Sequence, residues 1–210
     1  QTFENYKLSV KSFSNMKWQY CPTPKPDKDS IIVEVKSVGL NFKDIMVALN
    51  ILKEDAFAGG WTRTSLGTEC SGVIVSLGDG SDAKIEGKDS HEDDEDGEDS
   101  QKDGKEKYYN GTKYIENGVV VVKNGNTTFK VGDRVLAAPI QGETCFQKYC
   151  ACSSMSLVKM GDDVDFNLAA GYRVAISTAV LCLVTHGHLQ KEDTILIHCG
   201  SGGVGLTAIQ

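Results

Sequence analysis

The sequence predicts a mixed β and α/β fold, in which a β-rich region comes first and the beginning of an α/β region follows. Three observations support this prediction. Short segments that alternate apolar and polar residues, joined by turns rich in glycine and aspartate, fill the first part of the chain. A long stretch rich in Ala, Leu and Val then follows a helical repeat. Finally, an apolar strand-like segment leads directly into the glycine-rich residues 200–205.

The overall composition is that of a globular protein. The chain has 210 residues, of which 40% are hydrophobic and 24% are charged. This length allows one complete domain and part of a second. The composition argues against a disordered chain and against a coiled coil. The first residue is Gln1 and not methionine, so we expect a piece of a longer protein.

Four segments of the β-rich region are predicted to be strands, namely residues 31–38, 71–76, 119–123 and 133–137. In residues 31–38, β-branched and polar residues alternate, which is typical of a half-buried strand. Several short strands separated by glycine-rich turns predict a barrel or a sandwich.

An acidic insertion lies between the second and third predicted strands. Residues 82–116 carry enough Asp and Glu to account for the net charge of −7 of the whole chain. Such a segment buries too little apolar surface to offset the entropy of ordering, so we predict a disordered surface loop. The alternative is a calcium-binding loop formed by Glu92, Asp94, Asp96, Gly97 and Asp103. Its first and last residues depart from the EF-hand pattern, which favours the disordered loop.

Outside this insertion the chain is close to neutral. It shows neither a basic face for nucleic acid nor a polybasic patch for a membrane surface. No apolar run reaches the roughly 18 residues of a membrane-spanning helix. The seven cysteines fall at irregular spacings, several of them in apolar runs, which indicates reduced, buried thiols and a cytoplasmic protein.

Residues 168–210 are predicted to contain helices, one strand and a glycine-rich loop. Residues 168–189 are predicted to be mainly helical with a break near Gly171, and residues 194–198 to form a buried strand. A G-x-G-x-x-G sequence follows and opens another helix. Glycines at such a turn let the backbone approach a pyrophosphate, whose charge meets the free N–H groups of the helix N-terminus. An ordinary strand-to-helix turn is the alternative, but this context favours dinucleotide binding.

Four motifs resemble, in the same order, those of the zinc-free medium-chain dehydrogenase/reductase superfamily. They are GLNFKDIM (39–46), LGTECSGV (66–73), FKVGDRVLA (129–137) and LIHCGSGGVG (196–205). Within this superfamily the chain most resembles the enoyl reductase domains of type I fatty acid synthases and reducing polyketide synthases. Segments that match the fatty acid synthase type in particular are SNMKW (14–18), GGWTRTSLGTECSG (59–72) and STAVLCLVTHGHL (177–189).

The resemblance implies a GroES-like β-barrel domain followed by the truncated start of a Rossmann domain. Residues 1–170 would form the GroES-like substrate domain, with residues 82–116 as its disordered acidic insertion. Residues 171–210 would supply the linking helix, the first strand and the glycine loop of the Rossmann domain.

The resemblance also implies a reaction and partners. Enoyl reductases of this type pass hydride from NADPH to the β-carbon of a trans-2-enoyl thioester, which an acyl carrier protein holds on its phosphopantetheine arm. The resulting enolate is protonated at the α-carbon, and the protein supplies orientation and charge stabilisation. Other synthase domains would lie in the same chain, the full-length protein would be a homodimer, and this fragment alone would be inactive. The alternatives are a fragment of a free-standing zinc-free quinone or enone reductase, and a non-catalytic remnant of a synthase.

We predict no metal site. Zinc-dependent relatives carry Cys where Asn41 stands and His where Thr68 stands, and neither Asn nor Thr is a normal zinc ligand. Cys145, Cys150 and Cys152 lie close together in the sequence but lack a fourth ligand, so we interpret them as strand cysteines.

The predicted cofactor site combines two side chains with the glycine loop. Asn41 resembles the Asn near the nicotinamide ribose and the reacting carbonyl, and Thr178 resembles the Thr that faces the nicotinamide. The alternatives are a turn residue for Asn41 and, for Thr178, a helix residue that bonds to its own backbone. The loop residues of the predicted site are Gly200, Ser201, Gly202, Gly203, Val204 and Gly205. The proton donors of the family lie beyond residue 210, so the catalytic residues are not assigned.

Several other polar residues are predicted to be structural. Asp44 is expected in the first turn of a helix that starts at Phe42 or Lys43. His186 and His188 are expected at a helix end, and His198 is expected to pack at the end of the buried strand.

Three positions depart from the family pattern and bear on activity or on substrate shape. Arg173 replaces a Pro, and Ile176 replaces a Tyr that lines the site in relatives. Leu52 stands where some polyketide-type reductases have a Tyr that is proposed to donate the proton.

Overall fold

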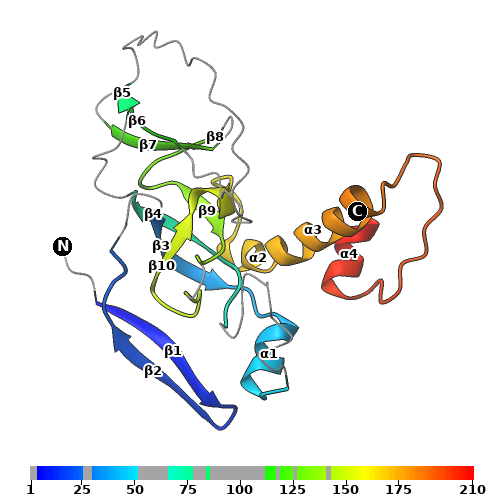
Figure 1. The fold of residues 1–210 in the computed structure, drawn as a ribbon, viewed down its shortest axis with the longest axis horizontal. Coiled ribbons are helices and arrows are strands. Elements are labelled where there is room, and N and C mark those ends of the chain that lie inside the picture. Colours follow the sequence, from blue (N-terminus) through cyan, green and yellow to red (C-terminus); the bar gives the residue numbers. More distant parts are fainter. Residues whose placement is uncertain are drawn as a thin grey trace, which may run out of the picture.

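The computed structural model describes residues 4–25, 30–51, 66–77, 84–85, 112–116, 119–124, 127–140 and 143–210. Strands make up a β region, and helices α2, α3 and α4 extend from it as a helical region (Figure 1). Within the described residues, no helix is both long enough and apolar enough to cross a membrane.

A five-stranded antiparallel sheet forms the centre of the β region, in the order β10-β3-β4-β9-β11. Its strands are β3 (Ser30–Val38), β4 (Cys70–Ser76), β9 (Arg134–Ala137), β10 (Tyr149–Ser153) and β11 (Val158–Lys159). The strands predicted at 31–38, 71–76 and 133–137 are therefore confirmed. The sheet does not close into a barrel by continuous pairing, and isolated bridges such as Pro139 to Cys152 add to it.

Strand β3 is more deeply buried than its alternating sequence predicts. Ile31 and Val33 contribute to the main core, whereas Ile32 packs with Tyr149 and Ala151 on the opposite face of the sheet. Because both faces are covered, the first half of β3 is fully buried and not half-buried as expected. Each such side chain contributes about 1.5–3 kcal/mol of transfer free energy.

A hairpin that the sequence analysis did not predict precedes the central sheet. It consists of β1 (Asn5–Ser12) and β2 (Asn15–Cys21), which pair antiparallel. Asn5 is completely buried and joins the hairpin to β10, because its amide donates to the carbonyl oxygen of Tyr149 (3.4 Å) and accepts from the N–H of Tyr149 (3.0 Å). A side chain thus replaces a strand-to-strand backbone pair here.

A second sheet contains β5 (Lys84–Ile85), β6 (Thr112–Glu116), β7 (Val119–Asn124) and β8 (Thr127–Phe129). It confirms the strand predicted at 119–123. This sheet also corrects the prediction that the whole acidic insertion is disordered. Residues 84–85 and 112–116, near the two ends of the insertion, form strands. These ends share a β-sheet ladder, which supplies the backbone hydrogen bonds that composition alone did not reveal. The candidate calcium-loop residues lie outside the described residues.

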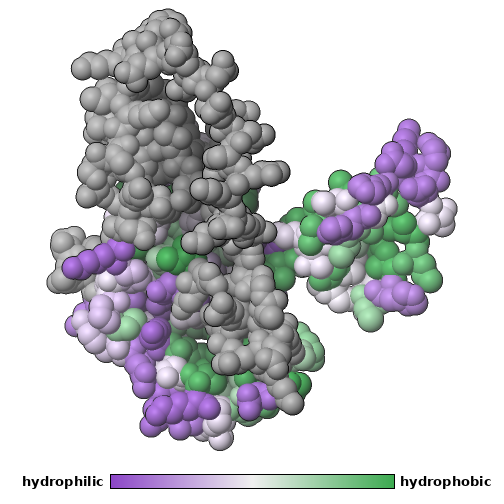
Figure 2. Space-filling view, viewed as in Figure 1, coloured by the Kyte–Doolittle hydropathy of each residue, from purple (hydrophilic) through white to green (hydrophobic). Residues whose placement is uncertain are grey.

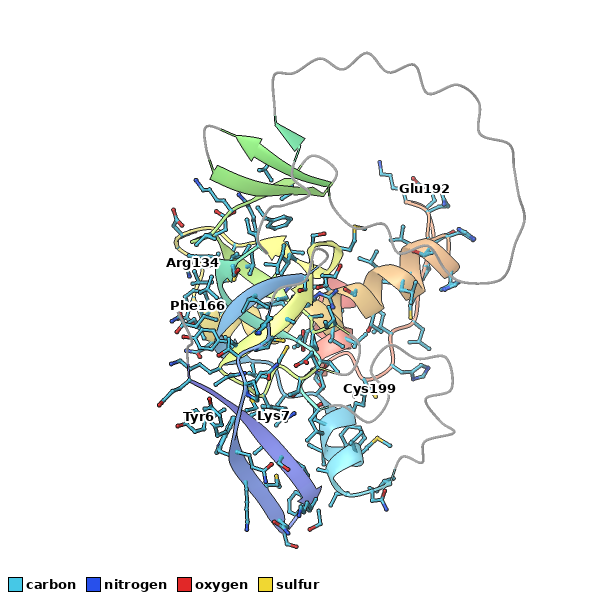
Figure 3. The ribbon with its side chains drawn as sticks, turned by 60° about the vertical axis from the view of Figure 1, so that its left-hand side comes forward. Tyr6, Lys7, Arg134, Phe166, Glu192 and Cys199 are labelled. Carbon is cyan, nitrogen blue, oxygen red and sulfur yellow. The ribbon has the colours of Figure 1, made fainter. Side chains whose placement is uncertain are left out.

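The helical region begins with α2 (Phe166–Ala170) and continues through α3 (Tyr172–Val180) into a π-helix, η3 (Leu181–His186). The predicted break is confirmed, since Gly171 leaves the helical conformation with φ −95° and ψ 1°. Helix α4 (Gly203–Ile209) packs beside α3 (Figure 1). At the other end, the Arg134 guanidinium of β9 stacks over the Phe166 ring at 4.4 Å and donates to the carbonyl oxygens of Asp162 and Val164 (Figure 3).

The strand predicted at 194–198 does not form. Residues 194–197 have no regular secondary structure and His198 lies in a turn, and none of them has a strand partner in the part of the chain that the structure describes. Leu196 is 81% exposed, and His198 is exposed as well, so its predicted packing is wrong. A strand needs neighbouring strands for its backbone hydrogen bonds, whatever its intrinsic preference.

Candidate active site

Helix α1 (Phe42–Ala48) holds the first predicted site residue, Asn41, at its N-cap. The Asp44 carboxylate accepts from the Asn41 N–H with Oδ2 (2.9 Å) and from the Gly67 N–H with Oδ1 (2.9 Å). Asp44 is buried, and its predicted structural role in the first turn of the helix is confirmed. It ties the start of α1 to the loop before β4, which carries the other residues of the site.

Gly67 is required at this junction. Its φ of +67° lies in the left-handed region that favours glycine. A Cβ atom on this residue would also lie 2.8 Å from Cδ2 of Phe146. The loop can therefore turn directly beneath α1, and it brings Thr68 and Glu69 to the side chain of Asn41.

The Asn41 side chain lies between the next two residues of that loop. Its Nδ2 atom donates to Oγ1 of Thr68 (3.2 Å) and to Oε1 of Glu69 (2.9 Å). A carboxylate only accepts hydrogen bonds, which fixes the orientation of the Asn41 amide with its nitrogen toward Glu69. The two positions compared with zinc ligands, Asn41 and Thr68, are thus in direct contact. Asn41 has a structural role as the N-cap of α1, which is close to the turn residue named as its alternative. Its side chain also contacts Thr68 and Glu69.

Glu69 is the residue of this cluster that the sequence analysis missed. It is only 1% exposed, and its second oxygen, Oε2, accepts from the backbone N–H of Val174 (2.7 Å) in α3. Gly39 makes room for it, since a Cβ on Gly39 would lie 2.7 Å from Cγ of Glu69. The available signal was an acidic residue directly before a strand that is otherwise apolar or small. One carboxylate therefore joins the β region to the helical region.

Thr178 lies one helical turn after Val174. Its hydroxyl donates to the carbonyl oxygen of Val174 (2.7 Å), which is the backbone contact named as its alternative. Val174 thus donates to Glu69 with its N–H and accepts from Thr178 with its C=O. The two predicted side chains, Asn41 and Thr178, belong to one hydrogen-bonded chain that runs through Glu69.

The glycine loop approaches the same helix from the other side. Gly202 is the N-cap of α4, and its N–H donates to the carbonyl oxygen of Cys199 (2.9 Å). The Thr207 hydroxyl of α4 lies 3.3 Å from the carbonyl oxygen of Ala175 and nearer to two carbonyl oxygens of its own helix, and Gly203 lies close to Ala175. The loop and the Asn41 cluster therefore both pack against the first turns of α3, as the prediction of one combined site requires.

Two glycines of the loop differ in what they exclude. A Cβ on Gly205 would lie 2.3 Å from the carbonyl oxygen of Cys199, so the fold itself requires glycine there. At Gly202 the nearest atom would be 3.3 Å away, a tight contact that a small shift relieves. In the dinucleotide fingerprint, the second glycine allows close approach of the pyrophosphate and the third allows close packing. The two positions fit these roles.

The cysteines form part of the core. Cys70, Cys145, Cys150 and Cys152 are completely buried, and the sulfurs of Cys150 and Cys152 are 3.8 Å apart on β10. Hydrogen bonds to Cys150 and Cys70, together with burial, raise the pKa of the Cys145 thiol well above its ordinary value. Among the described residues, no group of three or more His, Cys, Asp or Glu side chains is arranged to hold a metal ion.

The remaining predicted positions surround the site or lie away from it. Ile176 of α3 is 45% exposed. His186 ends η3 as expected, and His188 follows it with a φ of +47°. Leu52 lies outside the described residues.

Comparisons with known proteins place this geometry in context. No protein-family model matches the chain. The chain is 27% identical over 206 residues to the highly reducing polyketide synthase lcsB of Purpureocillium lilacinum, which covers 97% of this chain and 6% of that protein. It is 29% identical over 188 residues to the reducing polyketide synthase FUB1 of Gibberella fujikuroi. This match covers 89% of this chain and 5% of that protein. The chain thus spans a small part of the length of these relatives.

Solved structures share the fold. The CurK enoyl reductase superposes with a TM-score of 0.67 at 22% identity, over 99% of this chain and 50% of that one. A quinone oxidoreductase from Coxiella burnetii gives a TM-score of 0.65 at 20% identity, over 99% and 52%. A mycobacterial protein solved in complex with NADPH gives 0.61 at 19% identity, over 97% and 48%.

The resemblance predicted from the sequence is confirmed. The chain is homologous to a segment of highly reducing polyketide synthases. It has the mixed fold of the CurK enoyl reductase and of the Coxiella burnetii quinone oxidoreductase, consistent with a GroES-like region and part of a Rossmann domain. The relatives named above are polyketide synthases, so the closer likeness to fatty acid synthases stays a prediction.

Proposed function

We propose that the chain contributes the substrate-side region and the first part of the cofactor site to an NADPH-dependent enoyl reductase of a polyketide synthase. The observation that carries this proposal is the convergence of Asn41, Thr178 and the glycine loop on the first turns of α3. The printed names of the relatives, reducing polyketide synthases and an enoyl reductase, support the same function.

The residues divide the work of cofactor binding. The backbone of the loop at Gly202 would receive the pyrophosphate at the start of α4, because the first N–H groups of a helix have no partner within the helix. Asn41 and Thr178 would hold the nicotinamide end. When bound, NADPH supplies the hydride, while this chain supplies binding, orientation and exclusion of water. Packing of the loop on α3 through Thr207 and Ala175 would keep the two ends of the site in register.

The proposed substrate is a trans-2-enoyl thioester on the phosphopantetheine arm of an acyl carrier protein. Other synthase domains would lie in the same polypeptide, and the complete protein would act as a homodimer in the cytoplasm. The polyketide synthase relatives are far longer than this chain, which supports the multidomain setting. A quinone or enone reductase is the second candidate, favoured by the fold shared with the Coxiella burnetii quinone oxidoreductase.

Turnover of a crotonyl thioester tests the proposal. The complete protein is expected to oxidise NADPH with crotonyl thioester in the presence of a strong chelator. Asn41 and Thr68 stand where zinc-dependent relatives carry Cys and His, and neither residue is a normal zinc ligand. Loss of activity with chelator and its return with zinc would contradict a metal-free mechanism. Reduction of a quinone but not of the thioester would favour the second candidate. Reduction of neither by a protein that binds NADPH would indicate a non-catalytic remnant, with Arg173 and Ile176 as the first residues to revert.

A further inference from the structure

The Glu69 carboxylate has two hydrogen-bond donors from different regions of the molecule. Oε1 accepts from the Asn41 side chain of the β region, and Oε2 accepts from the Val174 N–H of the helical region. The side chain is 1% exposed, so these contacts replace water completely. Leaving either donor unpaired in such a site costs about 1–3 kcal/mol. Glu69 therefore restricts the orientation of the Asn41 amide and of the Val174 N–H.

The first consequence concerns Asn41. The Asn41 nitrogen has two hydrogens, and the structure uses them on Thr68 and Glu69. The amide therefore has no N–H left to donate to the oxygen of a substrate. The amide oxygen takes part in the capping box of α1, where it faces the backbone N–H of Asp44. It has a second lone pair, so a further partner of the amide must donate to this oxygen, as a hydroxyl group does. This favours a contact with a cofactor hydroxyl over a contact with the reacting carbonyl.

The second consequence concerns Thr178. The backbone of Val174 links Glu69 to the Thr178 hydroxyl, because its N–H donates to Glu69 and its C=O accepts from Thr178. The position of Thr178 relative to Asn41 thus depends on the bond between Glu69 and Val174. Preorganisation of this kind places binding groups before the ligand arrives, which lowers the entropy cost of binding.

We propose that Glu69 is a positioning residue of the cofactor site, which fixes the Asn41 amide with its oxygen available to a cofactor hydroxyl and holds Thr178 in register with it. This inference rests on the proposed function, because it assigns the network to NADPH. It makes Glu69 neither an acid nor a base in the reaction.

A donor and acceptor exchange tests the proposal in the complete protein. Glu69→Gln keeps the length of the side chain but has one acceptor oxygen instead of two. The Val174 N–H is fixed in the backbone, so the oxygen of the introduced glutamine stays with it and the new NH₂ group faces Asn41. Asn41 must then rotate its amide and present its nitrogen to the cofactor. Fluorescence titration is expected to show a Kd for NADPH raised about tenfold.

Adding Asn41→Asp to Glu69→Gln restores the original pattern. The introduced aspartate accepts from the NH₂ group of the introduced glutamine with one oxygen and presents the other oxygen to the cofactor, while the Thr68 hydroxyl rotates to donate. The Kd of this double variant is expected to return to within about threefold of the wild type, as a double-mutant cycle for a coupled pair requires. Asn41→Asp alone places two carboxylates in contact and is expected to weaken binding.

Asp44→Asn is the matched control, because Asp44 is also a buried carboxylate with two donors, both of them backbone N–H groups. Asp44→Asn is expected to lower the Tm. If it also raises the Kd for NADPH, adding Asn41→Asp should not lower the Kd again.

The outcomes separate the inference from the proposed function. Unchanged NADPH affinity in Glu69→Gln, or a double variant that binds no better than Asn41→Asp alone, would overturn the positioning role. The second comparison applies even when Glu69→Gln by itself does not fold. A wild-type protein that does not bind NADPH would instead overturn the proposed function, and the assignment of this network to the cofactor would fall with it.

Discussion

The β region and the helical region bury their apolar residues to very different extents. In the β region, Phe129, Val33 and Ile74 are at most 1% exposed. In the helical region, Leu196 and Ile209 are 81% and 62% exposed, and Figure 2 shows hydrophobic residues over much of its surface. The strands of the β region find hydrogen-bonding partners within the chain, whereas residues 194–198 find none among the described residues. Comparable sequence patterns therefore give structure in one region and not in the other.

The difference shows what local sequence can specify. Residues 31–38 and 194–198 are both rich in β-branched and aliphatic residues, and both predict strands. The first segment pairs with β4 and β10 on either side. Solved proteins with this fold are about twice as long as this chain, since it covers 50% of the CurK enoyl reductase. A strand is a property of a sheet, and sequence preference becomes structure only where partners are present.

The two regions should differ most in how much a single buried or exposed side chain contributes to stability. Phe129→Ala removes a fully buried ring from the main core and is expected to lower the free energy of unfolding by about 3–5 kcal/mol. Leu196→Ala changes an exposed residue, so its effect should stay within about 0.5 kcal/mol. Urea denaturation of the two variants measures the difference. Similar losses would show that residues 194–198 pack as firmly as the core.

One position in the helical region, Gly205, is as tightly packed as the core of the β region. Gly205→Ala places a Cβ 2.3 Å from the Cys199 carbonyl oxygen, and the resulting backbone shift is expected to cost about 1–3 kcal/mol. Gly200→Ala is the control, since its nearest contact, Ile209 Cδ1 at 3.5 Å, is ordinary. Thermal melting of the complete protein compares them. Equal Tm values for the two variants would mean that the loop adjusts freely and that the third glycine has no packing role.

The smallest effect concerns the thiols. Cys182 and Cys199 of the helical region are exposed, whereas the other five cysteines are buried. Mass spectrometry after brief alkylation of the native chain is expected to find label on the two exposed thiols only. Rapid labelling of Cys145 or Cys152 would contradict a closed core.

The same thiols give the β region a pH dependence. Hydrogen bonds to Cys150, and burial, raise the pKa values of Cys145 and Cys152 above the ordinary value of 9.0. The native state therefore keeps these protons to higher pH than the unfolded chain. The contribution of these two thiols to stability is complete below pH 9 and is lost as the pH rises above it, so they should lower the Tm in that range.

The parts of the fold with local signals were predictable. The alternating residues of β3 and β4, the break at Gly171 and the helix that follows the glycine loop all appear where expected. Asp44 was predictable because first-turn carboxylates are favourable at helix N-termini. The β1–β2 hairpin was not predicted, since its contacts with the central sheet, through Asn5 and through the backbone of residues 6–8, are to residues 146–149, far away in the sequence.

The candidate site residues were named from motifs and stay a prediction, and the contacts between them were not predicted. Asn41, Thr178 and the glycine loop were identified from motifs, and the structure brings them to one helix. Their link, Glu69, was missed because an acid between Thr68 and Cys70 has no periodicity or spacing that indicates burial. Only its partner at Val174, 105 residues away in sequence, reveals its role.

Titration with NADPH tests whether cofactor binding needs more of the protein than the helical region described here. The 210-residue chain is expected to bind NADPH weakly or not at all, because one loop and one short helix cannot hold the adenosine half of the cofactor. A polypeptide that continues through a whole dinucleotide-binding domain should bind it, and Gly202→Val in that polypeptide should abolish binding. Saturation of the 210-residue chain at micromolar NADPH would contradict this account.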